Sequence, residues 1–525
     1  MANHGLALGG VLLNKKFQIL IGLLLCAGLS FAKKDVDEGP FQFGKVLSPL
    51  STISMESVEI SAYMPGEKLL FVAGGEKVLE ILDMANPAHP VKKGKLSLPG
   101  DASSVTVHGN LVAVSLLNDP EWKMGHVQVM RYEGGLKVLG LFEACFQPDM
   151  ITFTPNGKNL LVACEGSPDS DFKTDPPGGI AVLSQKNGAW ETPQIDVIGF
   201  ENLDSTALMN SGVRKTGTQG FAQSLEPEYI TVSEDSKWAW VSLQENNAMA
   251  LFDVSLKKVT DVFPLGYVDH SKPGFGLDAT KNKKIEIKNH PLRGLRQPDG
   301  IAAFSAHGKT FVLTANEGAP VNDYSAWTDV TTFKELCQKN YLDESVCTNE
   351  ALNEIGELTV SNLEYDELSL KNFPNGKMPY AYSFGTRSVS LFDGHSKKLI
   401  WDSGDDLEQI ISKTAPGYFN WNAKKNKVKI DSRSDDKGCE PENVTVGSVN
   451  GKRYAFVGLE RMSGIAVFDL TDVDHPKIVD YYMDPRDRGP EGLLFIPAEK
   501  SPIPKTALLI VCYEYSKTLT VYKVN

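Results

Sequence analysis

Residues 226–245 read Glu226-Pro227-Glu228, then YITVSEDSKWAWVSLQ, then Glu245, and this stretch decides the fold. An acidic residue after proline opens a strand of alternating apolar residues, a polar turn follows, and a second apolar strand ends in glutamate. The pattern recurs at 147–165, 298–317, 441–460 and 490–514, and in looser form from Glu59 and from Ser103. The chain therefore repeats one β-hairpin along its length.

Each hairpin is followed by further short strands, such as AMALFDV ending near Asp253 and GIAVFDL ending near Asp469. Four short antiparallel strands in each of seven repeats predict a seven-bladed, all-β propeller. Because each repeat packs against its neighbours and has no closed core of its own, we expect one domain over residues 33–525. Only one strand follows Glu514, so we expect residues 41–47 to supply the missing strand and close the last blade.

The first 32 residues are typical of a secretory signal peptide. Lys15 and Lys16 precede an apolar run over 17–29, and the small residues that favour cleavage end at Ala32. Cys26 leaves a lipoprotein alternative open, although the leucine before it is large for such a site. No second apolar span follows, so we expect a periplasmic or secreted protein without a membrane span after cleavage.

The charge of the chain narrows the classes of partner. Removing residues 1–32 takes away two lysines and no acidic residue, so the net charge changes from −13 to −15. Such a surface repels nucleic acid and anionic lipid and attracts cations.

Six cysteines remain after cleavage, an even number that suits an oxidising compartment. Cys337 and Cys347 lie ten residues apart in one loop and are expected to form a local disulfide. For the other four, both disulfide pairing and buried free thiols stay open: Cys145, Cys164, Cys439 and Cys512.

The long irregular segments all fall on connections that a propeller places on one face, whereas the turns of the opposite face are short. Binding and catalytic residues often lie on such long loops, which a rigid scaffold positions. We expect the site on this face, with residues 316–380 as an insertion in blade five; the long segments are 165–178, 200–227, 266–298, 316–380 and 403–441.

The same face should carry a ring of carboxylates at the mouth of the central channel. Crowded carboxylates raise one another's pKa unless a cation intervenes, and calcium takes six to eight oxygen ligands. We expect calcium or another divalent metal, with capping of backbone N–H groups as the alternative for any single member. Besides Glu59, the candidate metal ligands are Asp149, Glu165, Glu228, Glu245, Asp299, Glu317, Glu442, Glu460, Glu491 and Glu514.

Signals for catalysis are weak, because no nucleotide-binding loop, zinc-protease motif or nucleophile elbow is present. Arg387, Arg461 and Lys437 are candidates for binding a phosphate, and His270 for acid–base chemistry or metal ligation. The acidic segment 431–436 suggests a calcium loop, but it lacks the glycine spacing of a known motif, which favours a solvated loop.

Several strings resemble the choice-of-anchor I proteins, which are exported bacterial propellers similar to mesenchyme-specific cell-surface glycoproteins. They are EPEYITVSEDSKWAWVSLQENNAMALFD from 226, QPDGIAAF from 297, DSRSDDKGCEPE from 431 and GPEGLLFIPAE from 489. The resemblance implies association with cell surfaces and calcium-based mineral, and bacterial members are often labelled alkaline phosphatase.

Two functions therefore compete, because a third, a quinone or haem redox propeller, lacks any cofactor motif. The first is a binding or scaffold protein whose acidic face holds calcium or a cationic ligand and contacts a cell-surface partner. The second is a metal-dependent phosphomonoesterase, which would place metal-bound water on the same carboxylates.

Overall fold

The computed structural model describes residues 39–525 except 121, 323 and 366, so the predicted signal peptide over 1–32 lies outside the described residues. Strands dominate the fold and form small antiparallel sheets that follow one another along the chain. The first four sheets are β3(Ile60–Met64) to β6(Val91–Ser97), β7(Asp101–His108) to β10(Leu136–Phe146), β11(Pro148–Phe153) to β14(Ala189–Ile198), and β15(Pro227–Val232) to β18(Lys258–Pro264).

Three further sheets complete the series. The fifth pairs β21(Ile301–Ala306) and β22(Lys309–Ala315) with β26(Val389–Asp393) and β27(Leu399–Asp402). The sixth runs from β28(Pro441–Val449) through β29(Lys452–Leu459) and β30(Gly464–Asp469) to β31(Lys477–Met483). The seventh contains β32(Pro490–Ile496), β33(Ala507–Tyr513) and β34(Thr518–Val524).

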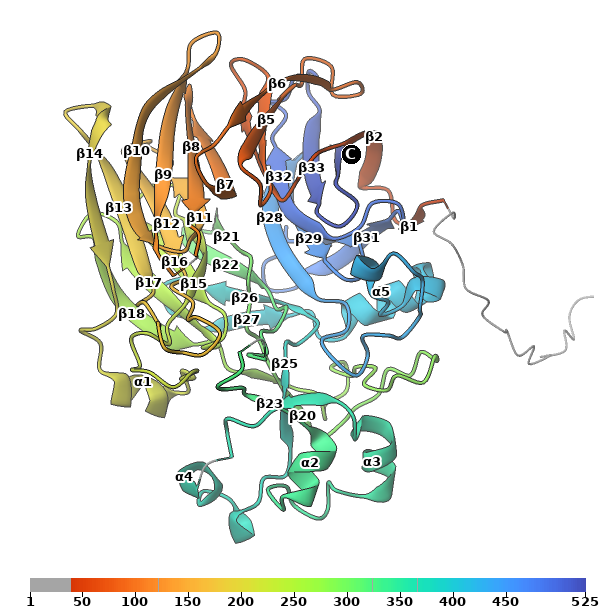
Figure 1. Ribbon diagram of the computed structural model, residues 1–525. Coiled ribbons are helices and arrows are strands. Elements are labelled where there is room, and N and C mark those ends of the chain that lie inside the picture. Colours follow the sequence, from red (N-terminus) through yellow and green to blue (C-terminus); the bar gives the residue numbers. More distant parts are fainter. Residues whose placement is uncertain (1–38, 121, 323, 366) are drawn as a thin grey trace, which may run out of the picture.

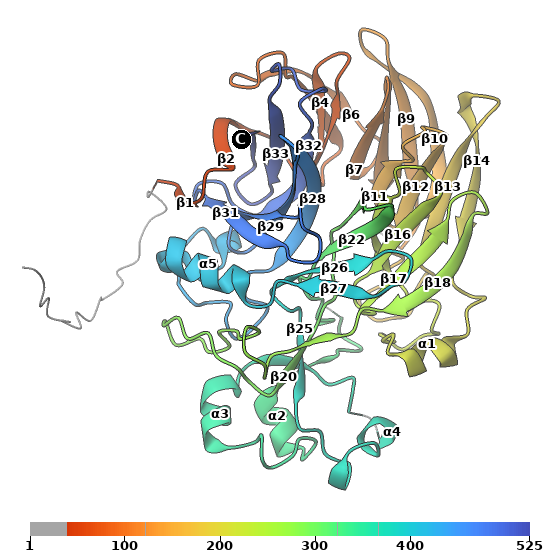
Figure 2. The ribbon, with the colours of Figure 1, turned by 180° about the vertical axis from the view of Figure 1, so that it is seen from behind.

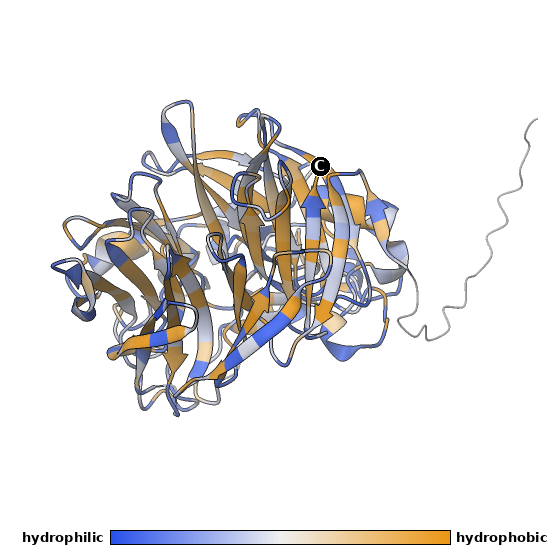
Figure 3. Cartoon of the chain, turned by 90° about the horizontal axis from the view of Figure 1, so that it is seen from above, coloured by the Kyte–Doolittle hydropathy of each residue, from blue (hydrophilic) through white to orange (hydrophobic). Residues whose placement is uncertain are grey.

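The first strands of these sheets contact one another in a closed circuit: β3, β7, β11, β15, β21, β28, β32 and back to β3. A buried apolar cluster lies between each pair of neighbouring sheets, including the pair formed by the seventh and the first. Apolar residues accordingly gather in the strands and polar residues in the loops (Figure 3). Burial between sheets therefore holds the circuit together, as expected for a propeller.

The closing strand lies later than residues 41–47, where the sequence analysis placed it. β2(Leu47–Ser54) pairs with β34 and completes the seventh sheet, whereas β1(Phe41–Phe43) pairs with β31 and adds a fifth strand to the sixth. Gly44 divides the segment: its φ is +86°, and a Cβ there would lie 2.3 Å from the carbonyl oxygen of Val479. Only glycine fits such a bend, so the chain changes sheets at this point.

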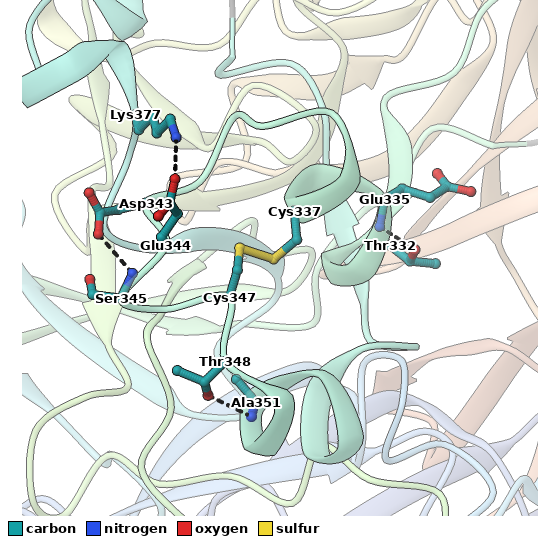
Figure 4. The surroundings of a disulfide bond; sticks show 10 residues. All are labelled: Thr332, Glu335, Cys337, Asp343, Glu344, Ser345, Cys347, Thr348, Ala351 and Lys377. Atoms are coloured by element: carbon teal, nitrogen blue, oxygen red, sulfur yellow. Dashed lines mark hydrogen bonds and ion pairs between the residues drawn. A yellow bond between two sulfur atoms is a disulfide. The ribbon is translucent and has the colours of Figure 1, made fainter.

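The insertion between β22 and β26 builds a sheet of its own together with the preceding connection. Its order is β19(Tyr267–Asp269), β20(Leu292–Leu295), β25(Ala381–Phe384), β24(Thr359–Ser361) and β23(Val330–Thr332). The helices α2(Phe333–Gln338) and α3(Asn349–Ile355) pack beside it around a separate apolar cluster. The predicted disulfide between Cys337 and Cys347 is confirmed and joins α2 to the segment that leads into α3 (Figure 4).

A second disulfide joins Cys145 at the end of β10 to Cys164 at the end of β12. Cys439 and Cys512 are buried free thiols, so both alternatives left open for these four cysteines occur.

The excursions gather at one end of the molecule. The insertion, which includes α4(Glu367–Leu370), lies there, α1(Ser205–Ser211) lies at the same end beside β18, and α5(Asp406–Thr414) flanks the sixth sheet (Figures 1 and 2). Within the described residues, no helix is both long and apolar enough to span a membrane.

Candidate functional site

Proline positions the predicted carboxylates. Four inner strands begin at proline, and each proline lies opposite the last residue of the neighbouring strand, as Pro148 lies opposite Cys164. A strand tolerates proline at its first residue, where its missing N–H is not needed. The register shifts directly after each of these prolines, which re-aims the side chains that follow. The acidic residue after proline and the glutamate after the neighbouring strand, such as Asp149 and Glu165, therefore lie at the same end of the sheet.

A cavity of about 550 Å³ lies where the inner strands converge. All seven sheets, or the segments leading into them, contribute to its lining, so it occupies the centre of the circuit. The lining includes Glu59, Asp101, Asp149, Tyr229, Asp299, Asn443 and Glu491. We call this cavity the channel cavity.

Three groups of carboxylates lie close enough to share a metal ion, since their oxygen atoms are within 4.8 Å of one another. They are Asp299 with Glu317 and Glu442, Glu317 with Glu440 and Glu460, and Glu460 with Glu491 and Glu514. Six of the ten predicted ligands are thus brought together in chained groups.

The remaining four predicted ligands lie on the neighbouring third and fourth sheets. Asp149 lines the channel cavity, and Glu165 and Glu245 line a smaller cavity of about 130 Å³, together with Tyr324. The carboxylate of Glu228 lies close enough to Glu165 and Glu245 for their charges to raise its pKa.

Basic side chains neutralise one side of the ring only. Lys437 contacts Glu317 and lies 3.1 Å from Glu440 Oε2, while Arg433 and Arg461 lie 2.6 Å and 3.5 Å from Glu440. Burial would raise the pKa of Glu440, but Lys437, Arg433 and Arg461 together lower it to about 2. Glu440 is therefore a fully compensated anion.

The carboxylates on the other side of the ring lack basic partners. Among the ion pairs of the described residues, none involves Asp149, Glu228 or Glu491. Burial first, and neighbouring carboxylates second, raise the pKa of Glu59 to about 7 and of Glu245 to about 8. The same two causes raise the pKa values of Asp149, Glu228, Glu442 and Glu491 well above the ordinary range. These carboxylates would gain stability from an added cation.

Two buried oxygen atoms reinforce this conclusion. Glu442 is 8% exposed and Asn443 is 3% exposed, and in the described part of the chain neither Glu442 Oε2 nor Asn443 Oδ1 has a hydrogen-bond partner. A buried polar atom without a partner costs about 1–3 kcal/mol, so such atoms mark a place where a ligand or ordered water belongs. Asn443 also begins a glycosylation sequon, but its burial rules out modification of the folded protein.

Of the candidate basic and catalytic groups, Arg461 and Lys437 lie at the ring and Arg387 and His270 do not. The buried Arg387 guanidinium donates to Glu408 and to the carbonyl oxygens of Asp278, Ser434 and Asp436. Nδ1 of His270 lies 2.7 Å from the carbonyl oxygen of Phe275, and burial lowers the pKa of His270 to about 4. Both side chains are buried and contact protein atoms away from the ring, and Nε2 of His270 has no hydrogen-bond partner among the described residues.

Sequence reasoning missed Glu226, Glu440 and Asn443. Glu226 lines the smaller cavity, Glu440 binds three basic side chains, and Asn443 lines the channel cavity. The repeat contained a signal for the first two, because both occupy the position directly before the strand-opening proline.

Two curated proteins are similar in sequence to parts of this chain. It is 29% identical over 282 residues to the mesenchyme-specific cell surface glycoprotein of Strongylocentrotus purpuratus, a match that covers 48% of this chain and 36% of that protein. It is 34% identical over 120 residues to Gigasin-3a of Magallana gigas, covering 22% of this chain and 40% of that protein. The chain thus matches less than half the length of either relative.

Among solved structures, hydrazine synthase of Kuenenia stuttgartiensis aligns with 90% of this chain and 97% of its own, at 12% identity and a TM-score of 0.46. That likeness is too distant to bear on function. The sequence profile of the choice-of-anchor I domain matches residues 59–473, which is most of the chain. The protein belongs to the choice-of-anchor I domain family.

Proposed function

We propose that this protein is an exported, seven-bladed β-propeller that works as a binding protein and holds calcium ions at its acidic channel. The channel cavity carries this proposal, because half-buried carboxylates from several sheets line it beside the buried, partnerless oxygens of Glu442 and Asn443. Carboxylate and amide oxygens are the ligands that calcium prefers.

Binding would change the protonation of the site. Metal ligands must be deprotonated, so a cation that enters the channel cavity displaces the protons that burial otherwise favours on Glu59 and its neighbours. The compensated side of the ring, where Lys437 occupies the space between Glu317 and Glu440, would remain as it is. The cation would therefore bind toward Asp149, Asp299 and Glu491.

An extracellular, surface-related role is consistent with this chemistry. One of the curated relatives is named a cell surface glycoprotein, the N-terminal sequence predicts export, and two disulfides suit an oxidising compartment. We propose that the calcium-loaded face, with the insertion beside it, contacts a cell-surface or mineral partner.

The phosphomonoesterase alternative stays a prediction without a supporting observation. It needs a basic group free to bind phosphate, whereas both terminal nitrogens of Arg387 donate to protein oxygens, and Lys437 and Arg461 are ion-paired with glutamates.

Calcium content and calcium-dependent stability test the proposal. The variant Glu228→Gln with Glu442→Gln removes two uncompensated carboxylates while keeping their size. We expect it to bind fewer calcium ions by elemental analysis and to gain less in Tm from calcium than the native protein does. Glu234→Gln, in an exposed turn, is the matched control and should behave as the native protein. Equal gains in Tm for native protein and the double variant would overturn the proposal.

A further inference from the structure

The smaller cavity, where the third sheet meets the fourth, shares no lining residue with the channel cavity. Three glutamates and two aromatic rings face its volume of about 130 Å³: Glu165, Glu226, Glu245, Phe172 and Tyr324. Asn322 also lines the cavity and is exposed, which places one wall at the surface of the protein.

One of these glutamates, Glu165, has a counterpart in the fifth sheet. In the third and fifth sheets, the residue three positions after the repeated proline pairs with a residue that precedes a glutamate by three positions. These pairs are Ile151 with Val162 and Ile301 with Thr314. Glu165 and Glu317 therefore occupy the same place in the repeat. Each is followed by a glycine of positive φ, Gly166 at 72° and Gly318 at 96°.

Glu226 has its counterpart in the sixth sheet. Glu226 and Glu440 each directly precede the proline that opens the first strand of their sheet. The first strands of the third and fourth sheets contact each other, as do those of the fifth and sixth. Glu317 and Glu440 therefore repeat the arrangement of Glu165 and Glu226.

The counterpart pair binds an ammonium group. Nζ of Lys437 contacts Glu317, lies 3.1 Å from Oε2 of Glu440 and donates to the carbonyl oxygen of Gly318 at 2.8 Å. Two glutamates and a glycine carbonyl in these places of the repeat thus hold a primary ammonium in this protein.

A fixed segment delivers Lys437 to this place. Asp431 and Ser434, just before it, are buried, and Arg387 donates to the carbonyl oxygen of Ser434. Segment 431–436 is therefore not the solvated loop that the sequence favoured, at least at these two residues.

The fourth sheet has no such lysine of its own. Gln223 lies three residues before Glu226, as Lys437 lies three residues before Glu440. The lysine that follows in the smaller cavity's surroundings, Lys215, donates to the carbonyl oxygen of Gly217 at 3.2 Å. A basic partner in place of Lys437 must therefore come from another molecule.

The charge beside the cavity is also reversed. Glu245 and Arg461 each come two residues after the leucine that lies opposite the repeated proline. Arg461 approaches Glu440 in the sixth sheet, whereas Glu245 adds a carboxylate in the fourth. Among the described residues, no lysine or arginine side chain forms an ion pair with Glu226 or Glu245.

One oxygen atom at this site is buried without a partner. It is Oε2 of Glu245, which has no hydrogen-bond partner in the described part of the chain. Burial first, and neighbouring carboxylates second, raise the pKa of Glu226 and of Glu245. A cation in the cavity would therefore stabilise both groups.

Existing hydrogen bonds leave room for this cation. Glu165 accepts from Gln147 and Ser167, and Glu317 accepts from Gln244 while it contacts Lys437. A carboxylate has about four acceptor positions, so further donors can bind.

An alkyl ammonium fits the cavity better than a metal ion. Within the described part of the chain, the carboxylate groups close enough to share a metal ion do not include Glu165, Glu226 or Glu245. The rings of Phe172 and Tyr324, whose centroids are 4.7 Å apart, form a wall that attracts an organic cation and packs against its alkyl stem. Pockets for drug-sized ligands measure about 300–1,000 Å³, so this cavity suits one narrow chain.

We propose that the smaller cavity binds a primary ammonium group on an alkyl stem, between Glu165 and Glu226, as Lys437 binds between Glu317 and Glu440. The ammonium belongs to a lysine side chain of a partner protein or to a small amine. This site is independent of the calcium proposed for the channel cavity, because the two cavities share no lining residue.

Isothermal titration calorimetry of the full mature chain with butylammonium chloride tests the site. At about pH 8 an alkyl ammonium keeps its proton. We expect Glu226→Gln to weaken binding at least about tenfold, because it removes a charge-assisted hydrogen bond. Glu201→Gln, in an exposed loop, is the matched control and should bind as the native protein does. Absence of binding to the native protein, or equal binding to native protein and Glu226→Gln, would overturn the proposal.

The native protein alone keeps the test decisive if Glu226→Gln does not fold. Tetramethylammonium donates no hydrogen bond and should not displace butylammonium; displacement by it, or by an equal concentration of calcium, would show a different kind of site and overturn the proposal. N-acetyl-lysine-methylamide carries the same ammonium beside two peptide bonds. Tighter binding of this probe than of butylammonium assigns the site to a lysine of a partner protein, and equal or weaker binding assigns it to a small amine.

Discussion

Lys437→Met removes the basic side chain at the centre of the compensated side of the ring. Lys437 is 8% exposed, contacts Glu317, lies 3.1 Å from Glu440 and donates to the carbonyl oxygen of Gly318 at 2.8 Å. Methionine fills a similar volume without the charge, so the effect is electrostatic.

The expected loss in the free energy of unfolding follows from the contacts that Glu440 and Glu317 keep in Lys437→Met. Breaking a buried ion pair by removing one partner costs about 3–5 kcal/mol. Glu440 keeps Arg433 and Arg461, whereas Glu317 keeps only the hydrogen bond from Gln244 among the described side chains. We therefore expect Lys437→Met to lower the free energy of unfolding by about 3 kcal/mol, the lower end of this range. At an unfolding entropy of about 2 cal/mol/K per residue, a domain of this length should lose about 3 °C in Tm.

Thermal unfolding followed by circular dichroism, in EDTA and in calcium, measures this loss. The exposed Lys452, 3.3 Å from Asp469, offers the control Lys452→Met, which should cost at most about 1 kcal/mol. Calcium should restore part of the Lys437→Met loss, because Glu317, Glu440 and Glu460 then form a carboxylate group with fewer cations nearby. A Tm in EDTA equal to that of the control would refute the electrostatic reasoning.

Two further predictions concern the same end of the molecule. The pKa of Glu59 is raised from an ordinary 4.5 to about 7, and that of Glu245 to about 8. Between pH 4.5 and these raised values, the two carboxyl groups bind more protons in the folded state than in the unfolded chain. In EDTA the free energy of unfolding, measured by urea denaturation, should therefore decrease as pH rises from 4.5 to about 8, and a steady increase would contradict the burial of these groups. Arg214→Ala removes the ion pairs that the buried Arg214 makes with Asp329 at 2.8 Å and Glu364 at 2.7 Å, so limited proteolysis should cut within residues 316–380 faster than in the native protein, and an unchanged rate would show that the insertion is held by other contacts.

The repeated hairpin was readable because its determinants are local. Alternation of apolar residues, a polar turn and a strand-opening proline all act within about 20 residues. The local sequence therefore predicts the first two strands of each sheet. The position of the closing strand could not be predicted from the sequence. It depends on how closely Gly44 approaches Val479, which is distant from it in the sequence.

The carboxylate ring was predicted residue by residue, since position in the repeat determines position on the face. The distribution of basic partners was not, because Arg433 and Lys437 reach the ring from a long connection with no repeat of its own. Arg387 looked equally suited to a phosphate site, yet it is held by carbonyl oxygens of that same connection.

The sequence by itself determined the hairpin repeat, the family resemblance, the acidic face and the Cys337–Cys347 disulfide, because each rests on short-range pattern or composition. Tertiary structure alone decided which carboxylates are compensated, that Glu442 and Asn443 are buried with partnerless oxygens, and which cysteines remain free. The physical reason is that compensation, burial and hydrogen-bond satisfaction are properties of groups brought together from distant segments, and no local pattern specifies them.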